Sequence, residues 1–507
     1  MIAQAHSATL IGIEALPIVV EVDLVGTIQD NTGNFLLVGL PDKAVTESRD
    51  RVKTAMRNSE LDFPNKRILC NLAPGDIRKE GPWLDLPMAL ALCAVTGQVP
   101  ISELEDTLFL GELGLDGTLR PIDGAVSVAL MALEKGFRRL VVPEGNAAES
   151  AIAPGLEVYG VRTLLDAVEL MNGGGGLFSP QPIAVMQEAA PPEYLVDFAD
   201  VKGQRHAVRA LEIAAAGGHN VLMVGPPGSG KTMLARRLPT ILPPLSMNES
   251  IAVTRIHSAG GAKRERRGLI SERPFRSPHH SASYAALVGG GKNPKPGEVS
   301  MAHFGVLFLD EMPEFDRGVL EALRQPLEDG VVTVSRVQAT IEFPAECILI
   351  GAMNPCPCGF KGYPEQNCTS SSTTCAKYAS KISGPLMDRI DLHLEVPRLK
   401  ADELLGASQG EPSEAIRARV LQARERQHLR LGNNRTNAKM SPREIKETIV
   451  LDAECEAFMR AVLTKMNLSA RVFDRILKVG RTIADLAGSN ALQKAHLAEA
   501  VQYRDRS

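Results

Sequence analysis

The stretch that decides the fold runs Val221-Leu222-Met223-Val224-Gly225-Pro226-Pro227-Gly228-Ser229-Gly230-Lys231-Thr232. Its four apolar residues predict a buried strand, and the glycine-rich run after them is typical of a phosphate-binding loop that opens a helix. The glycines leave room for backbone N–H groups to turn toward a β-phosphate, which the positive end of the helix dipole also attracts. Lys231 is expected to reach the β- and γ-phosphates, and Thr232 to bind Mg²⁺. A chance glycine loop is the alternative, but the full eight-residue pattern between a strand and a helix favours a nucleotide site.

A second apolar run ends in two carboxylates. Val306-Leu307-Phe308-Leu309 is continuously hydrophobic, as expected of a strand buried on both faces, and Asp310 and Glu311 follow it. Such a pair is often only the start of a solvated loop. At about eighty residues after a phosphate-binding loop, however, Asp310 is expected to join the Mg²⁺ shell and Glu311 to polarise the attacking water. The two motifs together predict hydrolysis of a nucleoside triphosphate.

Length and composition bound the class of protein. The 507 residues exceed what one hydrophobic core holds and predict about three domains. The net charge of −4 restricts any contact with DNA to local basic patches. No apolar run approaches the length of a membrane span, and the N-terminus lacks a charged leader with an apolar core. We therefore expect a cytoplasmic protein with no membrane partner.

Composition divides the chain into four segments. Residues 1–172 mix apolar strands with a helical pattern, and residues 173–192, rich in glycine and proline, predict a linker. Residues 193–396 alternate apolar strands with helices, which is typical of a parallel sheet covered on both faces. Residues 397–507 keep only helical periodicity and predict an all-α lid.

The order of the motifs resembles the AAA+ ATPases of the magnesium-chelatase type, and in particular the YifB/ComM family, over essentially the whole chain. Five segments carry the resemblance: Asp200-Val201-Lys202-Gly203-Gln204, Arg276-Ser277-Pro278-His279-His280-Ser281, residues 305–314, Gly351-Ala352-Met353-Asn354-Pro355 and residues 383–391. The resemblance implies an α/β fold with an AAA+ P-loop parallel-sheet core, an N-terminal S5/Lon-protease-like α+β domain and a C-terminal helical lid. It also implies a homo-oligomer, a hexameric ring, that hydrolyses ATP with Mg²⁺ at its subunit interfaces.

The resemblance assigns roles to further residues. Asn354 matches the sensor-1 residue that orients the lytic water, and Gln204 and its neighbours are expected to contact the adenine. Arg389 matches the arginine finger that reaches the γ-phosphate held by the neighbouring subunit, and Arg471 matches the sensor-2 arginine of the lid. The planar fork of arginine suits a γ-phosphate better than lysine does. A surface ion pair is the alternative for either arginine.

Two basic segments are expected to contact DNA, single-stranded or branched. Residues 330–341 alternate apolar and polar side chains around a turn, which predicts a β-hairpin. Arg336 occupies the place of the pore residue in the hairpin of the related minichromosome-maintenance helicases, with a solvated hairpin tip as the alternative. The other segment lies between the two nucleotide motifs and would bind phosphates without reading sequence, unless it is only a solvated face. Its residues are Lys263, Arg264, Arg266, Arg267, Lys292 and Lys295.

Four cysteines cluster in a loop rich in glycine, serine and threonine: Cys356, Cys358, Cys368 and Cys375. Thiolates in such a loop can close a structural zinc site that replaces a missing hydrophobic core. Their spacing departs from paired C-x₂-C motifs, so reduced free cysteines are an equal alternative. No spare histidine or carboxylate motif accompanies them, so a catalytic zinc is not expected.

The N-terminal segment is similar to the Lon-protease-type S5-like fold in residues 79–85 and 111–122. A working protease of that type needs a nucleophilic serine and an activating lysine. Trp83 stands at the serine position, and the lysine position falls near Val128. A binding or assembly role is therefore expected in place of proteolysis.

The resemblance to the YifB/ComM family implies an ATP-driven DNA translocase or helicase that promotes branch migration in recombination or natural transformation. The alternative is a magnesium-chelatase-type motor subunit that remodels a protein partner, against which the fused N-terminal domain stands. A third interpretation is a binding scaffold whose assembly is timed by ATP hydrolysis.

Overall fold

The computed structural model describes residues 2–27, 35–152, 155–174, 178–182, 194–261, 268–291, 294–335, 340–363, 367–399, 410–432, 435–466 and 469–504. The chain divides into two compact units. Unit 1 comprises residues 1–189, 247–270 and 292–296, and unit 2 comprises residues 190–246, 271–291 and 297–507. Composition gave no sign that residues 247–270, counted above with the ATPase core, pack with the N-terminal segment.

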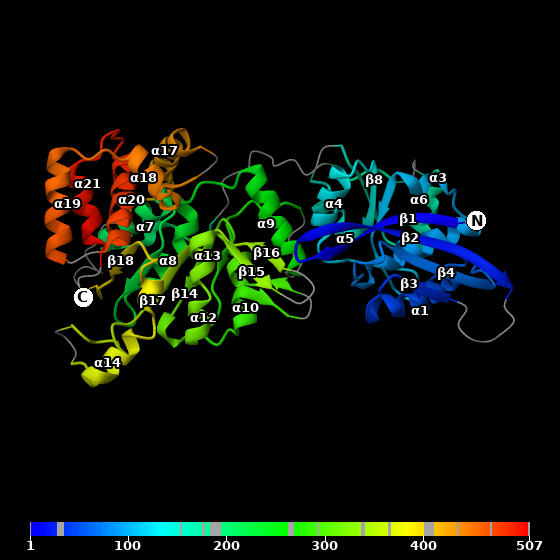
Figure 1. Ribbon diagram of the computed structural model, residues 1–507, viewed down its shortest axis with the longest axis horizontal. Coiled ribbons are helices and arrows are strands. Elements are labelled where there is room, and N and C mark those ends of the chain that lie inside the picture. The colour runs from blue at the N-terminus through cyan, green and yellow to red at the C-terminus, as the bar shows by residue number, and fades with distance from the viewer. Residues whose placement is uncertain are drawn as a thin grey trace. The chain divides into compact units, whose positions relative to one another are not determined.

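Unit 1 is built on a sheet that has seven strands within the described residues, in the order β3-β4-β2-β1-β5-β8-β9 (Figure 1). β2 pairs antiparallel with both β1 and β4, whereas the outer strands pair parallel to their neighbours. The bounds are β1 (Ile2–Ile11), β2 (Glu14–Thr27), β3 (Phe35–Val38), β4 (Lys66–Ala73), β5 (Thr107–Phe109), β8 (Arg139–Pro143) and β9 (Glu157–Val161). A separate small hairpin joins β6 (Glu112–Leu113) to β7 (Leu119–Arg120).

The helices of unit 1 pack on this sheet or, in the case of α9, on the helix α4. They are α1 (Lys43–Asn58), η1 (Pro82–Leu84), α2 (Asp85–Val95), α3 (Ser102–Glu105), α4 (Ala125–Glu134), α5 (Glu144–Ser150), α6 (Leu164–Met171) and α9 (Met247–Ala259). α2 is apolar all round and buried from Asp85 to Ala94, because it packs on the faces of β1 and β2 and on α1 and α6. Asp42 caps α1 by accepting a hydrogen bond from the Val45 amide at 2.8 Å.

The helix α9 joins unit 1 through both apolar and polar contacts. It packs on α4, and Ile251 meets Val126 and Ile152 in a small hydrophobic cluster. The Arg255 guanidinium donates to the Ile13 carbonyl at 3.1 Å and lies 2.7 Å from a Glu14 carboxylate oxygen. These contacts attach a helix that follows the phosphate-binding loop in sequence to the fold of the N-terminal segment.

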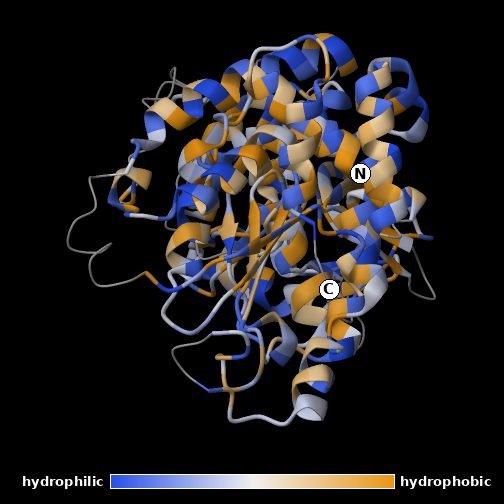
Figure 2. Cartoon of the chain, turned by 90° about the vertical axis from the view of Figure 1, so that its left-hand side faces the viewer, coloured by the Kyte–Doolittle hydropathy of each residue, from blue (hydrophilic) through white to orange (hydrophobic). Residues whose placement is uncertain are grey.

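Unit 2 holds a parallel sheet with five strands in the described part of the chain, in the order β11-β14-β17-β10-β18. The bounds are β10 (Val221–Val224), β11 (Phe275–Arg276), β14 (Val306–Leu309), β17 (Ile348–Met353) and β18 (Leu392–Glu395). β14 and β17 are buried along their whole length, because helices cover both faces of the sheet. Figure 2 shows strands at the centre of the view in orange, the hydrophobic end of the scale, and mixed orange and blue on surrounding helices. The predicted α/β core is confirmed.

Helices and short hairpins complete the core of unit 2. The helices are η3 (Phe198–Asp200), α7 (Arg205–Gly217), α8 (Lys231–Ile241), α10 (Tyr284–Val288), α11 (Glu298–Met301), η4 (Met312–Glu314), α12 (Arg317–Glu321), α13 (Arg324–Asp329), α14 (Ser372–Ala379) and α15 (Gly384–Met387). The predicted hairpin is formed by β15 (Val331–Ser335) and β16 (Thr340–Pro344), which pair antiparallel. The remaining short strands are β12 (Gly289–Gly290) and, in unit 1, β13 (Lys295–Pro296).

The C-terminal segment is helical, as predicted. Its elements are α17 (Ser413–Leu431), η5 (Asn437–Lys439), α18 (Pro442–Thr448), α19 (Ala453–Met466), α20 (Ala470–Leu486) and α21 (Lys494–Gln502). A buried network ties α20 to the sheet: the His219 ring lies 2.9 Å from the Thr482 hydroxyl and 3.1 Å from the Asp391 carboxylate. None of the helices in the described ranges is long and apolar enough to span a membrane.

Candidate active site

The phosphate-binding loop follows β10 and ends where α8 begins at Lys231. Gly228 and Gly230 have φ of +75° and +89°, in the left-handed region that glycine adopts without strain. A Cβ at Gly225 would lie 2.1 Å from the Val396 carbonyl oxygen, so the backbone leaves no space for a side chain there. Glycine is therefore required at these three positions, by the backbone conformation at two of them and by the lack of space for a side chain at the third.

Lys231 lies inside this loop. Its side chain is buried, and its Nζ donates to the carbonyls of Gly225 and Pro226 at 2.8 and 2.9 Å. The same Nζ is 3.4 Å from Oδ1 of Asn354, which follows β17. Burial lowers the pKa of Lys231, and the nearby carboxylates Asp310 and Glu311 oppose that change.

The acidic pair lies at the carboxyl end of β14, next to the loop. The Thr232 hydroxyl donates to Oδ2 of Asp310 at 2.8 Å. Glu311 has φ of +49°, a left-handed conformation that costs free energy in a residue with a side chain. Its amide donates to Oδ1 of Asp310 at 3.0 Å, and one of its carboxylate oxygens is 3.7 Å from Nδ1 of His280. Lys231, Thr232, Asp310 and Asn354 are thus brought together, although they come from three distant parts of the chain.

The residues present fit a magnesium nucleotide. Thr232 and Asp310 offer hydroxyl and carboxylate oxygens, the hard ligands that Mg²⁺ prefers. Lys231 supplies a cation beside the glycine turn, where an anionic phosphate is stabilised by backbone N–H groups. When bound, Mg²⁺ would neutralise charge on the phosphate oxygens.

Gln204 lies against the same loop. Its Nε2 donates to the Ser229 carbonyl at 2.7 Å, while its buried Oε1 has no hydrogen-bond partner among the residues that the structure describes. Gln204 therefore supports the loop through Ser229, a contact that the sequence did not predict. Its expected contact with the adenine stays a prediction.

The two predicted arginines have different surroundings. Arg389 donates to the Pro385 carbonyl at 2.8 Å and forms an ion pair with Glu328. Its Nε is buried and has no partner within the described ranges. Arg471 is exposed at the start of α20. Among the described residues, neither arginine contacts the phosphate-binding loop of its own chain. Their roles as arginine finger and sensor 2 therefore stay predictions.

Most residues predicted to bind DNA lie outside the described residues: Lys263, Arg264, Arg266, Arg267, Lys292 and Arg336. Lys295 is described, and its Nζ lies 3.4 Å from the Asp123 carboxylate within unit 1. The hairpin that leads to Arg336 is confirmed up to Ser335 on one strand and from Thr340 on the other.

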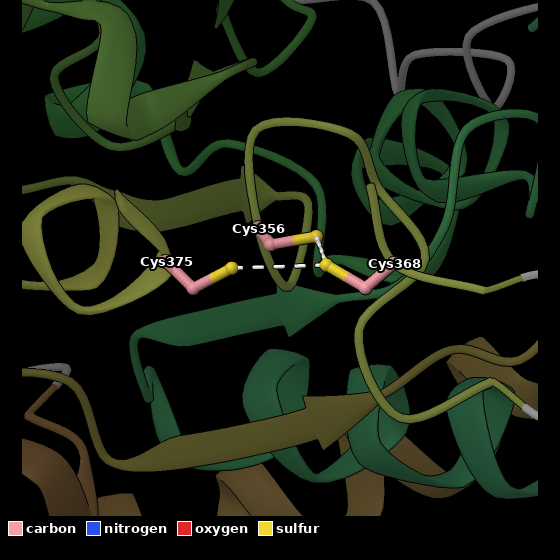
Figure 3. Close-up of side chains that lie close together, drawn as sticks. All are labelled: Cys356, Cys368 and Cys375. Atoms are coloured by element: carbon pink, nitrogen blue, oxygen red, sulfur yellow. Dashed lines mark hydrogen bonds between the residues drawn. The ribbon is translucent and has the colours of Figure 1, made fainter. Parts of the chain in front are cut away.

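The four clustered cysteines come together in space. Cys356 Sγ lies 3.2 Å from Cys358 Sγ and 3.7 Å from Cys368 Sγ, which is 3.8 Å from Cys375 Sγ. Figure 3 shows the sulfur atoms of Cys356, Cys368 and Cys375 pointing toward one another. These three form a group whose ligand atoms lie close enough to hold a metal ion. The cysteine cluster predicted from the sequence is therefore formed in the structure.

The positions that would carry protease chemistry are filled by hydrophobic residues. The Trp83 indole donates to the Ala8 carbonyl at 2.9 Å, and Val128 is buried. Neither side chain can act as a nucleophile or a base.

Sequence reasoning missed His280, which was quoted within a motif but given no role. Its position 3.7 Å from Glu311 follows from the fold, because His280 comes after β11 and Glu311 after the neighbouring strand β14. Adjacent histidines in a segment that precedes an acidic pair were the only available signal.

Comparison with known proteins identifies three family models that match separate segments of the chain. Three family models match: "Magnesium chelatase, subunit ChlI" over residues 197–404, "Subunit ChlI of Mg-chelatase" over residues 20–146, and "Magnesium chelatase, subunit ChlI C-terminal" over residues 410–504. The chain is similar to competence protein ComM of Haemophilus influenzae, with 43% identity over 99% of this chain and 97% of that protein. It is similar to YifB of Salmonella typhimurium to the same extent, 43% over 99% and 97%. A shorter match, 28% identical over 25% of this chain and 17% of the other, is with Lon protease of Rhizobium meliloti.

Proposed function

Because the chain belongs to the YifB/ComM family of magnesium-chelatase-like AAA+ proteins, and so has an ATPase role that uses ATP and Mg²⁺, we propose a more specific activity. The protein hydrolyses ATP at the subunit interfaces of a hexameric ring. It uses that energy to translocate DNA and to promote branch migration in recombination or natural transformation. We place the protein in the cytoplasm, where its DNA substrate is found.

One observation carries the hydrolytic part of this proposal. Thr232 donates to Asp310 at 2.8 Å while Lys231 lies 3.4 Å from Asn354, so the loop, the acidic strand and the sensor strand meet at one point. Lys231 binds the β- and γ-phosphates, Glu311 polarises the attacking water, and Asn354 orients it. Such positioning and electrostatic stabilisation account for nearly all of the catalysis in phosphoryl transfer.

The ring is supported by the environment of Arg389. Its recorded partners are Pro385 and Glu328, and its buried Nε keeps a donor without a partner in the described part of the chain. An arginine that is not used by its own phosphate-binding loop is available to the γ-phosphate of the next subunit. A cation supplied there stabilises the charge that develops as the phosphoryl group transfers.

Action on DNA is supported by the relative and by the charge pattern. The Haemophilus influenzae relative is named a competence protein. The basic residues 263–267 and Arg336 provide phosphate contacts that a ring repeats around its centre. Such contacts are independent of sequence, as a translocating enzyme requires.

The four-cysteine cluster is the second metal site of this proposal. We infer that it holds one structural Zn²⁺, because four sulfur ligands without an open position are typical of structural zinc. Cys347 is a free cysteine that, within the described residues, makes none of the sulfur–sulfur contacts that join the four clustered thiols.

A motor for a magnesium chelatase is the second candidate, since all three matching family models carry that name. The near-complete coverage of ComM and YifB, N-terminal segment included, favours the DNA enzyme. The two candidates differ in what stimulates hydrolysis: branched DNA in the first, and a porphyrin-metallating partner in the second.

The test is an ATPase assay with single-stranded, duplex and four-way-junction DNA, coupled to strand displacement on the junction. We expect the junction to stimulate phosphate release most and to be resolved into displaced strands. Glu311→Gln is the matched control, because it should keep ATP binding and DNA binding while blocking turnover. Binding of DNA without stimulation or displacement would reject the translocase in favour of a scaffold, and stimulation only by a chelatase partner would favour the motor subunit.

A further inference from the structure

We propose that a metal in the four-cysteine cluster acts as a brace for the ATP site: it holds Asn354 in position for hydrolysis, and the cysteine turn packs against the phosphate-binding loop. This inference rests on the ATPase activity proposed above and adds a regulatory role for zinc to it. The thiol cluster would then affect catalysis only indirectly, by positioning Asn354.

The spacing of the thiols fits one shared tetrahedral ion. Zinc lies about 2.3 Å from each thiolate sulfur, which places two sulfurs of a tetrahedral site about 3.8 Å apart. The separations are 3.7 Å for Cys356 to Cys368, 3.8 Å for Cys368 to Cys375, 3.4 Å for Cys358 to Cys368 and 3.2 Å for Cys356 to Cys358. The sulfurs of Cys356, Cys368 and Cys375 all lie within 4.8 Å of one another, and Cys358 is next to two of them. All of these exceed the length of a disulfide bond, about 2.05 Å, and the cysteines are free. The Lys361 amide also donates to Cys356 Sγ at 3.3 Å, which stabilises negative charge on that sulfur.

The first connection to the ATP site is covalent. β17 ends at Met353, Asn354 comes next, and Cys356 is two residues further on. Cys356 is fully buried, so its backbone has little freedom once its sulfur is bound. Fixing Cys356 therefore fixes the direction in which the chain leaves Asn354, whose Oδ1 is 3.4 Å from Nζ of Lys231.

The second connection is a close packing contact. The turn after Cys356 closes with a hydrogen bond from the Gly359 amide to the Cys356 carbonyl at 2.9 Å. A Cβ at Gly359 would lie 2.5 Å from Cδ of Pro227, so the cysteine turn rests directly on the phosphate-binding loop. Gly359 also has φ of +86°, which a residue with a side chain adopts only with strain.

The third connection runs through α14. Cys375 lies in this helix, and the buried Tyr378 follows it within the next turn. Lys381, just beyond the helix, lies 3.2 Å from the carboxylate of Glu314, three residues after Glu311. A metal that joins Cys375 to Cys356 therefore links α14 to both sides of the site.

These connections predict a specific kinetic defect when the metal is lost. The phosphate-binding loop keeps its own contacts to Lys231 and Gln204, so ATP binding should change by no more than about threefold. Asn354 loses its support, and a misplacement of about 1 Å at a reacting centre lowers kcat by up to about 100-fold. We expect a fall in kcat of about 10- to 100-fold for the metal-free protein.

The test compares the full chain with Cys368→Ser and Cys375→Ser, using Cys347→Ser as the matched control. Four quantities are measured: zinc content, ATP affinity, kcat and hydrogen exchange of residues 344–381. We expect about one zinc per chain in the wild type and in Cys347→Ser. In the two cluster variants, zinc should be lost, exchange should rise in the amides around Asn354, and kcat should fall while ATP affinity is kept.

The outcomes separate this inference from the function on which it rests. A zinc-loaded wild type that releases no phosphate would reject the ATPase proposal, whereas the zinc content would still stand. Zinc-free cluster variants with wild-type kcat would reject the brace. A wild type purified under reducing conditions that neither contains nor takes up zinc would reject the metal. Gly359→Ala, which keeps all four thiols, should retain zinc but lower kcat, and full activity there would reject the contact with Pro227.

Discussion

A glycine with nearly the same positive φ precedes a helix in each of the two units, but the residues that follow it differ in character. Gly230, with φ of +89°, precedes α8, and Gly81, with φ of +91°, precedes η1. Lys231 follows Gly230 and turns a cation into the loop. After Gly81, Trp83 folds over the turn, where a Cβ on the glycine would lie 2.2 Å from its ring. The two glycines share a positive φ but differ in ψ, which is 11° at Gly230 and 154° at Gly81, and the side chains that follow differ as well: one turn presents a cation and the other an apolar ring.

The largest expected effect tests whether unit 2 needs a second copy of itself. Isolated subunits that carry Arg389→Ala should bind ATP as the wild type does. In the assembled ring the substitution should lower phosphate release by about 10³-fold or more, because the charge at the γ-phosphate is not neutralised. Nucleotide binding and steady-state hydrolysis, measured on the same preparation, check this result. Full hydrolysis in the ring would show that Arg389 serves only its ion pair with Glu328.

The next effect tests the turn at Gly230, which presents the Lys231 cation. Lys231→Ala should lower hydrolysis by about 10²- to 10³-fold, because it removes a cation that stabilises the transferring phosphate. Trp83→Phe, the counterpart in the other turn, should leave hydrolysis unchanged. A comparable loss of activity in both variants would contradict the division of roles between the two turns.

The turn at Gly81, which Trp83 covers, should instead affect the free energy of unfolding. Trp83→Ala removes a large packed ring and the hydrogen bond to Ala8, and should lower the free energy of unfolding of unit 1 by about 3 kcal/mol. Denaturant unfolding followed by hydrogen exchange in each unit measures this loss. Trp83→Ser should be similarly destabilised and should cleave no peptide, since Val128 and its neighbours supply no base.

The smallest effect at neutral pH concerns a buried carboxyl in each unit. Burial of Asp391 would raise its pKa, but the hydrogen bond with His219 and the charges of Arg475 and Arg504 hold the pKa below its ordinary value. Its contribution to stability is therefore present above about pH 4 and lost as the pH falls below that value. Burial of Asp85 outweighs its hydrogen bond with Arg51 and raises its pKa.

The two shifts have opposite consequences in acid. Protonation of Asp85 is easier in the folded protein, so its contribution favours unit 1 at low pH and is lost as the pH rises through its raised pKa. We expect unit 2 to lose stability before unit 1 below about pH 4, as measured by hydrogen exchange in each unit. Asp391→Asn should flatten the acid dependence of unit 2, and an unchanged slope would contradict the assignment.

The parts that the sequence predicted are those that a local pattern determines. The apolar strand, the glycine turn and Lys231 follow one another directly, and the hairpin around residues 331–344 follows from alternating side chains. The packing of α9 could not be predicted, because Ile251 and its apolar neighbours would suit any hydrophobic partner. The contact between Gly359 and Pro227 could not be predicted from the sequence either. It arises because β10 and β17 pair in parallel, which brings the loops that follow them together.

The placement of α9 has a consequence for dissecting the protein. The chain enters unit 2 at residue 190, returns to unit 1 for residues 247–270, and returns again for residues 292–296. One proteolytic cut between the first unit and the second would leave α9 joined by peptide bonds to one fragment and docked on α4 of the other. The two pieces would then co-purify under native conditions and separate only in denaturant. A gene shortened to start at residue 194 would encode an α9 stripped of its covering surface, with Ile251 and Arg255 exposed to water.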